Sequence, residues 1–338
     1  MKRRAVIEDA IGESRAAIYE GRRLVELHLE RWSDFNMPRV GETWTGRASA
    51  IDASVGGIWM ELGKGPDGLL SFKAQSDMPK LTEGERVDAT IAKEAVTEKG
   101  PLLRYAGPPS RDKPGVVQVL GFRERIERRF PGIVFEEAPV GIVDAATERQ
   151  VAIPGGGTLT IDRTQALIAV DVDKGGAKTV MDCSVAAAKL VMSQLRLRGL
   201  GGLIAIDFPN LRQPKQRSTV IRVMEDLADA DPASVRIAPF SRFGVVEMTR
   251  GQDGPSLDAL MNDRFGRPTL ETQAIQALRR LEREAKASPG GRITLQVPEP
   301  LRNWLDDPSF EWREPLRERI GARFSVEPGE TLDVRSDR

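Results

Sequence analysis

The sequence predicts an α+β (mixed α/β) protein in which short strands come first and a mixed αβ core follows. Three patterns predict this class. Five short strands with turn residues between them lie within residues 39–105, and a strand–helix–strand pattern occupies residues 166–208. A helix with charges paired at i, i+4 spacing comes before a last alternating segment near the C-terminus. With 338 residues, the chain is long enough for two or three domains.

The composition limits the classes of function. The chain has 50 basic and 50 acidic residues, so a chain-wide basic excess is absent and any nucleic-acid site must be a local patch. No apolar run is long enough to span a membrane, and the N-terminal residues become acidic before an apolar signal core appears. The single cysteine, Cys183, excludes an internal disulfide and a thiolate zinc cluster. We therefore expect a cytoplasmic protein without a membrane segment.

Residues 1–36 contain two alternating segments joined at Gly21, which predicts a hairpin. The only histidine, His28, lies in the second segment, where alternation places it with Glu26 and Glu30 on the face opposite the leucines. We therefore interpret His28 as an exposed strand residue. Cys183 has no second histidine to act as its base, so catalysis by a histidine-based triad is nearly excluded and carboxylates with a metal are the best remaining candidates.

Residues 37–107 predict a small Greek-key barrel of the OB-fold type, because five short strands follow one another at close spacing. In "GGIWMELG", Ile58 and Met60 point inward and Trp59 points outward. An outward tryptophan on such a barrel is either a stacking platform for nucleic-acid bases or a residue covered by a neighbouring domain. Lys93 and Lys99 are candidate phosphate contacts beside it.

The second half of the chain predicts parallel strands joined by helices. Residues 107–115, "GPPSRDKPG", have the composition of a linker, and "RERIERRF" in the following interval predicts a short helix. "ALIAVDVD" and "LIAIDF" predict strands on either side of a helix over 184–198, with Ser184 as its N-cap. Such a βαβ unit places its two strands parallel. The residues after 268 predict a small αβ module.

Asp171 and Asp207 fall at the carboxyl ends of these two parallel strands, which is where ligands bind open α/β sheets. Asp173 shares the face of Asp171. Carboxylates that converge repel one another, and a divalent cation such as Mg²⁺ or Mn²⁺ relieves the repulsion. The alternative is that each aspartate caps the loop that follows its strand.

Basic residues directly follow the second aspartate strand. Arg212, Lys215 and Arg217 lie within the ten residues after Asp207, whereas Arg222, on the helix behind them, is typical of a solvated helix face. A carboxylate pair in a locally basic field suits a polyanion that is cut at a bound metal.

The segments "SQLRLRGLGGLIAIDFPNL", "KQRSTV", "SRFGVVEMTR" and "LTIDRTQALIAVDVDKG" resemble the catalytic core of the ribonuclease E/G family. The N-terminal segments "RAAIYEGRRLVELHLE" and "GRASAIDASVGGIWMELGKGPDGLLSF" are similar to its opening hairpin and RNA-binding barrel. The resemblance implies five parts: a hairpin (1–36) that packs on a ribonuclease H-like part of the core, an OB-fold RNA-binding domain (37–107), a reduced ribonuclease H-like or linker region (108–160), a deoxyribonuclease I-like catalytic domain (161–250) and a small C-terminal domain (268–334).

The resemblance also implies an activity. It implies a magnesium-dependent endoribonuclease that cuts single-stranded regions of rRNA, tRNA precursors or mRNA and leaves 5′-phosphate and 3′-hydroxyl ends. The family's two metal-binding aspartates fall on Asp171 and Asp207. A family asparagine falls on Asp173, which we take as a third catalytic residue, and a family acid falls on Asn210. The family's RNA-binding aromatic and basic residues fall on Trp59 and Lys99, whereas a second aromatic falls on Leu69.

Two parts of the family pattern are missing. Cysteines that form a zinc link between subunits are absent between Arg250 and Thr269, and the arginine–threonine pair of the family's 5′-monophosphate sensor is not recognisable in residues 108–155. We therefore expect no zinc, a homodimer only if it forms without zinc, and no 5′-end sensing. Two alternatives stay open: an RNA-binding protein of this fold with weak or lost catalysis, and a metal enzyme acting on DNA or on a small phosphate compound.

Overall fold

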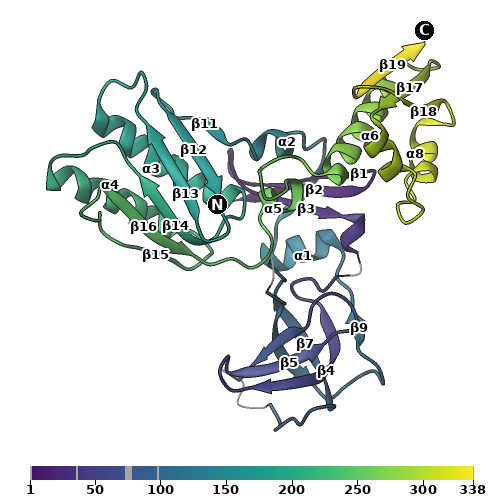
Figure 1. Ribbon diagram of the computed structural model, residues 1–338, viewed down its shortest axis with the longest axis horizontal. Helices are drawn as coiled ribbons and strands as arrows, with labels where there is room; N and C mark the ends of the chain where they lie inside the picture. The colour runs from purple at the N-terminus through teal and green to yellow at the C-terminus, as the bar shows by residue number, and fades with distance from the viewer. Residues whose placement is uncertain (1, 36, 73–77, 97–98, 338) are drawn as a thin grey trace.

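The computed structural model describes residues 2–35, 37–72, 78–96 and 99–337. A small N-terminal sheet lies at the centre of the molecule, and three other bodies surround it (Figure 1). A barrel lies below this sheet in the view, a larger sheet with helices lies to the left, and the C-terminal module lies at the upper right. The structure is thus the mixed α/β protein that the sequence predicts.

The N-terminal sheet is built from both ends of the first 150 residues. Its elements are β1 (Arg3–Ala10), β2 (Glu13–Glu20), β3 (Arg23–Arg31), η1 (Trp32–Asp34), α1 (Phe122–Arg129), β10 (Val134–Glu137) and α2 (Ile142–Ala146). The predicted hairpin is β2–β3; β1 precedes it as an antiparallel neighbour, and β10 joins parallel to β1. The interval 108–160 therefore supplies α1, β10 and α2 to this sheet. Ile126 and Phe130 pack on one of its faces, and Val143 packs on the other.

The barrel lies between β3 and α1 in the chain. Its strands are β4 (Thr43–Asp52), β5 (Gly57–Glu61), β6 (Gly68–Ser71), β7 (Arg86–Lys93), β8 (Leu102–Gly107) and β9 (Gly115–Gln118). The order β4–β5–β6–β8–β7 closes on itself through the β4–β7 pairing, and β6 runs parallel to β8. Ile58, Met60 and Leu103 fill the interior. β9 and the residues that follow it return the chain to α1.

The larger sheet forms the second body. Its elements are β11 (Gln150–Ala152), β12 (Thr158–Arg163), β13 (Ile168–Asp173), α3 (Val180–Leu197), β14 (Gly202–Asp207), α4 (Pro214–Ala228), β15 (Val235–Ile237) and β16 (Val245–Arg250). Its strand order is β11–β12–β13–β14–β16–β15, and β13 and β14 are parallel as the βαβ pattern predicts. The sheet begins at Gln150, before the domain boundary expected at residue 161.

Helices cover one face of this sheet and leave the other open. Val170, Ile206 and Val246 face the helices and belong to one buried cluster with residues of α3 and α4. The alternate positions on the other face, including Asp171, Asp207 and Glu247, are exposed. The aspartates therefore lie on the open face of the sheet.

Helix α3 begins earlier than the sequence predicts. Thr179 is its N-cap and accepts a hydrogen bond from the backbone N–H of Asp182 at 3.0 Å. The expected cap, Ser184, instead donates its hydroxyl to the Val180 carbonyl at 2.8 Å within the helix. Cys183 is buried in the first turns of α3, and burial raises the pKa of its thiol. A reactive thiolate is therefore disfavoured there.

After β16 comes α5 (Leu257–Met261), whose Leu257 and Met261 pack with the N-terminal sheet. The C-terminal module contains α6 (Leu270–Ala287), β17 (Arg292–Val297), α7 (Glu299–Leu305), α8 (Arg313–Ile320), β18 (Phe324–Pro328) and β19 (Asp333–Asp337). Its sheet has the order β18–β17–β19. The β1–β2 turn inserts into this module: Ile11 belongs to its buried cluster, and a Cβ on Gly12 (φ +87) would lie 2.9 Å from the Ile275 side chain. Only glycine combines this φ with so close an approach.

None of the helices that the structure describes is both long and apolar enough to cross a bilayer.

Candidate functional site

Asp171 and Asp207 are direct neighbours in the pairing of two parallel strands. The register aligns Asp171 of β13 with Asp207 of β14, and both side chains are exposed on the open face. Adjacent strands lie about 4.8 Å apart, so the two aspartates are neighbours on this face. Within the described part of the chain, neither carboxylate has a hydrogen-bond or ion-pair partner. A bound cation is the simplest way to balance such a pair.

Asp173 and Asn210 lie at the same edge of the sheet. Asp173 is the last residue of β13, opposite Thr158 of β12, and its carboxylate accepts a hydrogen bond from the Gly175 N–H at 2.9 Å. Asn210 is exposed in the loop that follows β14. Both residues depart from the family pattern. Asp173 ends the first aspartate strand, and Asn210 follows the second.

The donor set at this edge suits a hard cation held by few protein ligands. Across the residues that the structure describes, no three or more His, Cys, Asp or Glu side chains are grouped to hold a metal ion. Asp171 and Asp207 therefore supply two carboxylates, and water or substrate oxygens would complete the coordination. Mg²⁺ is commonly bound in this way, through one or two carboxylates plus substrate phosphates. The residues present fit such an ion.

The loop between β13 and α3 adds two lysines to the aspartate edge, and the sequence pattern did not single them out. Lys178 is exposed and Lys174 half-buried in this loop, which leaves the sheet at the aspartate edge. The 154–157 turn packs against its backbone: a Cβ on Gly157 would lie 2.5 Å from the Asp173 carbonyl oxygen. The run "KGGAK" directly after "DVD" is the sequence signal for this cationic loop.

The predicted basic residues after Asp207 have two different environments. Arg212 and Lys215 are exposed at the start of α4, whose N-terminus is closed by a capping box between Gln213 and Gln216. The Arg217 guanidinium instead donates to the Leu211 carbonyl at 2.8 Å and lies over the Phe240 ring, 5.5 Å from its centroid. Among these three described residues, Arg212 and Lys215 are therefore the cations exposed to solvent, and Arg217 stabilises the loop through its bond to Leu211.

The barrel presents the predicted RNA-binding residues on its surface. Trp59 of β5 is half-buried and is aligned with Leu69 of the adjacent strand β6, while its neighbours Ile58 and Met60 are buried. Lys99 is exposed just before β8, which pairs with β6. Lys93 has partners of its own: its ammonium donates to the Gln252 carbonyl at 3.3 Å and lies 3.6 Å from Asp253. The structure therefore places Lys93 against the loop after β16.

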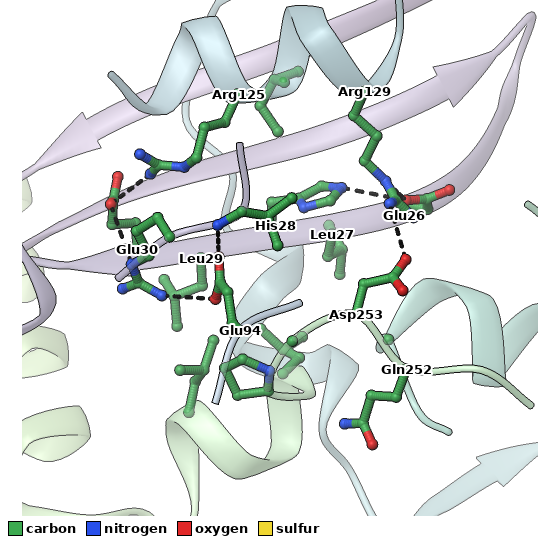
Figure 2. Close-up of a pocket in the computed structure, with 18 of the residues that line it drawn as sticks. Glu26, Leu27, His28, Leu29, Glu30, Glu94, Arg125, Arg129, Gln252 and Asp253 are labelled. Atoms are coloured by element: carbon green, nitrogen blue, oxygen red, sulfur yellow. Dashed lines mark hydrogen bonds and ion pairs between the residues drawn. The ribbon is translucent and has the colours of Figure 1, made fainter. Parts of the chain in front are cut away.

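A cavity of about 440 Å³ lies away from the aspartate edge, where β3, α1, the barrel and the 251–255 loop meet (Figure 2). Its lining is dense in ion pairs. Glu30 pairs with Arg125 of α1 at 2.5 Å, and Arg39 pairs with Glu94 of the barrel at 3.0 Å. The Glu94 N–H donates to the Asp253 carbonyl at 2.8 Å. Arg39 also lies 3.8 Å from Glu30 of β3, so it links the barrel to the N-terminal sheet, and Glu94 links the barrel to the 251–255 loop.

The expectation that His28 is exposed, on a face that it shares with Glu26 and Glu30, is wrong. Both glutamates are buried, because α1 and α3 cover this face of β3 with arginines, and His28 is half-buried against the Phe130 ring. Burial alone would raise the pKa of Glu26. His28 at 3.3 Å, Arg129 at 3.0 Å and Arg196 at 3.1 Å outweigh burial and hold this pKa at about 2.

These features define the class of protein: a mixed α/β fold in which an αβ sheet with paired aspartates at its edge and a small barrel are joined to one central sheet. Residues 133–253, which include both aspartate strands, match the model of the Ribonuclease E/G family. Curated relatives agree. Ribonuclease E of Haemophilus influenzae is 29% identical over 206 residues, which cover 57% of this chain and 22% of that protein.

Two further relatives are similar. Ribonuclease E of Escherichia coli K12 is 32% identical over 177 residues, covering 48% of this chain and 17% of that protein. Ribonuclease G of the same strain is 32% identical over 141 residues, covering 38% of this chain and 29% of that protein. The chain thus spans less than a third of the length of these relatives. Together, the family model and the relatives support membership of this chain in the ribonuclease E/G family, as its sequence predicted.

Proposed function

We propose that this protein is a metal-dependent endoribonuclease that cuts single-stranded RNA at the edge formed by Asp171 and Asp207. One observation carries the proposal: two exposed aspartates are aligned side by side on adjacent parallel strands, and the described residues offer them no partner. Exposed cations, Arg212, Lys215 and Lys178, lie in the loops that leave the same edge. The names of the relatives, Ribonuclease E and Ribonuclease G, support the same class of substrate and reaction.

In this proposal Asp171 and Asp207 hold Mg²⁺, with Mn²⁺ as a possible substitute. When bound, the ion supplies a water molecule of lowered pKa and stabilises charge on the scissile phosphate. Asp173, whose carboxylate accepts a hydrogen bond from the Gly175 N–H, would orient the attacking water or accept its proton. Arg212 and Lys215 attract the phosphates on either side of the scissile bond. The products would carry 5′-phosphate and 3′-hydroxyl ends.

The barrel supplies substrate affinity. Trp59 would stack on a base, and Lys99 would contact a phosphate, with Lys93 as a further contact if RNA displaces its present partners. Substrates would be single-stranded regions of rRNA, tRNA precursors or mRNA, and the activity would be cytoplasmic. The chain provides no cysteine pair for a zinc link, so we propose that the enzyme works without zinc and that any homodimer forms through other contacts.

The second candidate is an RNA-binding protein of the same fold with weak or lost catalysis. The observation that favours it is the small donor set: no group of three metal-ligating side chains is present in the described residues, and Asp173 and Asn210 depart from the family pattern. Binding without cleavage would identify this case.

The deciding experiment incubates the purified protein with a structured RNA in the presence of Mg²⁺, and in parallel with a chelator. Cleavage that requires Mg²⁺ and produces 5′-phosphate ends supports the enzyme. Binding with no cleavage at any metal concentration supports the second candidate. DNA of the same sequence, added as competitor, tests the remaining alternative: equal cleavage of the DNA would overturn the assignment to RNA.

A further inference from the structure

Two short turns in this protein have the same sequence pattern and the same hydrogen bonds. Residues 241–244 are Ser-Arg-Phe-Gly, and residues 263–266 are Asp-Arg-Phe-Gly. In both turns the first residue donates its N–H to the carbonyl of the fifth residue, at 2.9 Å in the first turn and 2.8 Å in the second. The glycine N–H donates back to the carbonyl of the first residue at 3.1 Å in each. Both glycines, Gly244 and Gly266, have a positive φ.

The side chain of the first residue completes each turn. Ser241 accepts from the backbone N–H groups of Phe243 and Val245, both at 3.3 Å. Asp263 accepts from Phe265 at 2.8 Å and Arg267 at 2.9 Å. These bonds fix the backbone on both sides of the phenylalanine, so its Cα–Cβ bond leaves the turn in a defined direction.

Each turn therefore holds a phenylalanine in solvent beneath an arginine. Phe243 is 84% exposed and Phe265 is 69% exposed, more than any other large apolar side chain described. The Arg242 guanidinium lies 5.7 Å from the Phe243 ring centroid, and the Arg264 guanidinium lies 4.7 Å from that of Phe265. A rigid exposed ring with a cation on it is a feature of surfaces that stack bases and contact phosphates.

Only the first of the two turns lies at the aspartate edge. Val245, the residue that follows it, is aligned with Asp207 in the antiparallel pairing of β14 and β16. Consecutive Cα atoms are about 3.8 Å apart and paired strands about 5 Å, so the Cα of Phe243 lies at most about 13 Å from that of Asp207. The second turn joins α5 to α6, outside this sheet.

A second connection fixes this spacing. Phe208, which directly follows Asp207, packs on Phe240 with ring centroids 5.6 Å apart, and Phe240 directly precedes the turn. The Arg217 guanidinium also lies over the Phe240 ring. The turn is therefore held to the Asp207 strand both by backbone pairing and by an aromatic contact.

We propose that the Arg242–Phe243 turn is an RNA-binding site, in which Phe243 stacks on a base next to the scissile phosphate and Arg242 contacts the adjoining phosphate. This inference rests on the proposed endoribonuclease function and adds a determinant of where RNA lies at its site. The chemistry favours single-stranded RNA as the occupant. The open sheet face is acidic through Asp171, Asp173 and Glu247, so a polyanion is held at this edge only where cations such as Arg242 are present.

The test uses Phe243→Ala, with Phe265→Ala as the matched control because it removes the same side chain from the same kind of turn elsewhere. Affinity for a single-stranded RNA oligonucleotide is measured by fluorescence anisotropy in an Asp171→Asn background, and KM and kcat are measured with Mg²⁺ in the native background. Loss of one stacked base predicts roughly tenfold weaker binding and a similar rise in KM for Phe243→Ala, and no change for Phe265→Ala. Phe243→Trp should retain affinity.

Removing the base itself locates the contact. The protein that retains Phe243 should bind an RNA with an abasic site beside the cleaved bond about tenfold more weakly than intact RNA. The Phe243→Ala variant should bind both RNAs equally. Equal losses for Phe243→Ala and Phe265→Ala would overturn the proposal. A second outcome would also overturn it: Phe243→Ala changes the molecular mass measured by light scattering but leaves the RNA affinity unchanged. The turn would then be a contact between copies of the chain. If no RNA is cleaved but Phe243→Ala alone weakens binding, the site stands and the proposed catalysis fails.

Discussion

Asp171 and Asp207 occupy equivalent positions on two adjacent parallel strands, and both are exposed on the side of the sheet that no helix of the described residues covers. The spacing follows from backbone geometry: strand pairing fixes it to about 5 Å, and the period of two puts both side chains on one face. The main chain thus brings two exposed carboxylates to one edge of the sheet. We propose that this pair binds a divalent cation against a phosphate.

Replacing either aspartate by asparagine should abolish cleavage and leave RNA binding largely intact. Asparagine keeps the shape of the side chain but removes the charge that holds the cation, and the mutated positions are exposed, so folding should not change. Cleavage of a labelled RNA at saturating Mg²⁺ measures the first effect, and anisotropy measures the second. Full activity in either Asp171→Asn or Asp207→Asn would remove these residues from the site.

Asp173→Asn is the internal comparison for this pair. It restores the residue that the family carries at this position, and Asp173 lies two residues beyond Asp171 with a hydrogen bond of its own to Gly175. We expect a milder loss than for Asp171 or Asp207. Complete loss of cleavage would instead make Asp173 a direct metal ligand.

Trp59→Ala and Lys99→Ala should raise KM for RNA more than they lower kcat. Both residues lie on the barrel, away from the aspartate edge, so they contribute affinity in the ground state and the transition state alike. A base stacked on Trp59 is worth about 1–3 kcal/mol. Steady-state kinetics separates the two constants, and circular dichroism checks the fold. Unfolding of Trp59→Ala would show that the half-buried ring serves the packing of the barrel instead.

The sequence predicted the parts of this protein that depend on local pattern. Alternation and the βαβ order place Asp171 beside Asp207, because the main chain alone determines that relationship. The same alternation failed at Glu26, which it placed in solvent. That face of β3 is covered by α1 and α3, elements about one hundred or more residues away in the chain, and their arginines make a buried carboxylate tolerable. Contacts between distant segments leave no periodic signal in a single strand.

The exposure of Phe243 is another feature that could not be predicted from the local sequence pattern. "SRFG" was part of the resemblance, but no local pattern shows whether its phenylalanine is buried or exposed. The exposure depends on hydrogen bonds made by Ser241 and on the packing of Phe240 against Phe208. Likewise, Arg217 and Arg212 look equivalent in sequence, and only the fold directs Arg217 onto Phe240.

Glu26→Gln should destabilise the protein at neutral pH and much less in acid. Burial raises the pKa of Glu26, but His28, Arg129 and Arg196 outweigh this effect and lower it from 4.5 to about 2. A carboxyl whose pKa is lower in the folded state stabilises the fold above its unfolded pKa, and the contribution is lost as the pH falls toward the folded pKa. The window is therefore about pH 5 to pH 2. A shift of this size corresponds to at most about 3 kcal/mol.

Urea unfolding at pH 7, 5 and 4 measures this effect. The difference in free energy of unfolding between the unaltered protein and Glu26→Gln should shrink as the pH falls. Glu136→Gln is the matched control, because Glu136 forms an ion pair with Arg4 at 2.6 Å on the surface, where such pairs contribute little. A pH-independent difference for Glu26→Gln would mean that packing, not charge, is what the substitution removes.

The last prediction concerns the 5′ end of the RNA. A pocket for a 5′-monophosphate needs an arginine fork that is free to meet the phosphate. Each arginine between residues 108 and 155 already has a partner in the structure. The pairs are Arg111 with the Val116 carbonyl, Arg123 with Glu137, Arg125 with Glu30, Arg128 with Glu124, Arg129 with Glu26, and Arg149 with Asp162.

The cavity beside α1 is lined by seven arginines and by four acids, Glu26, Glu30, Glu94 and Asp253. The arginines that α1 contributes to it already pair with carboxylates, so a phosphate that entered there would compete with these carboxylates. We therefore expect 5′-monophosphate, 5′-triphosphate and 5′-hydroxyl forms of one RNA to be cleaved at rates within a few-fold of each other, measured as kcat/KM under identical Mg²⁺ conditions. A tenfold preference for the monophosphate, about 1.4 kcal/mol of transition-state stabilisation, would contradict this. Arg125→Ala and Arg129→Ala would then be the substitutions that show whether α1 carries the preference.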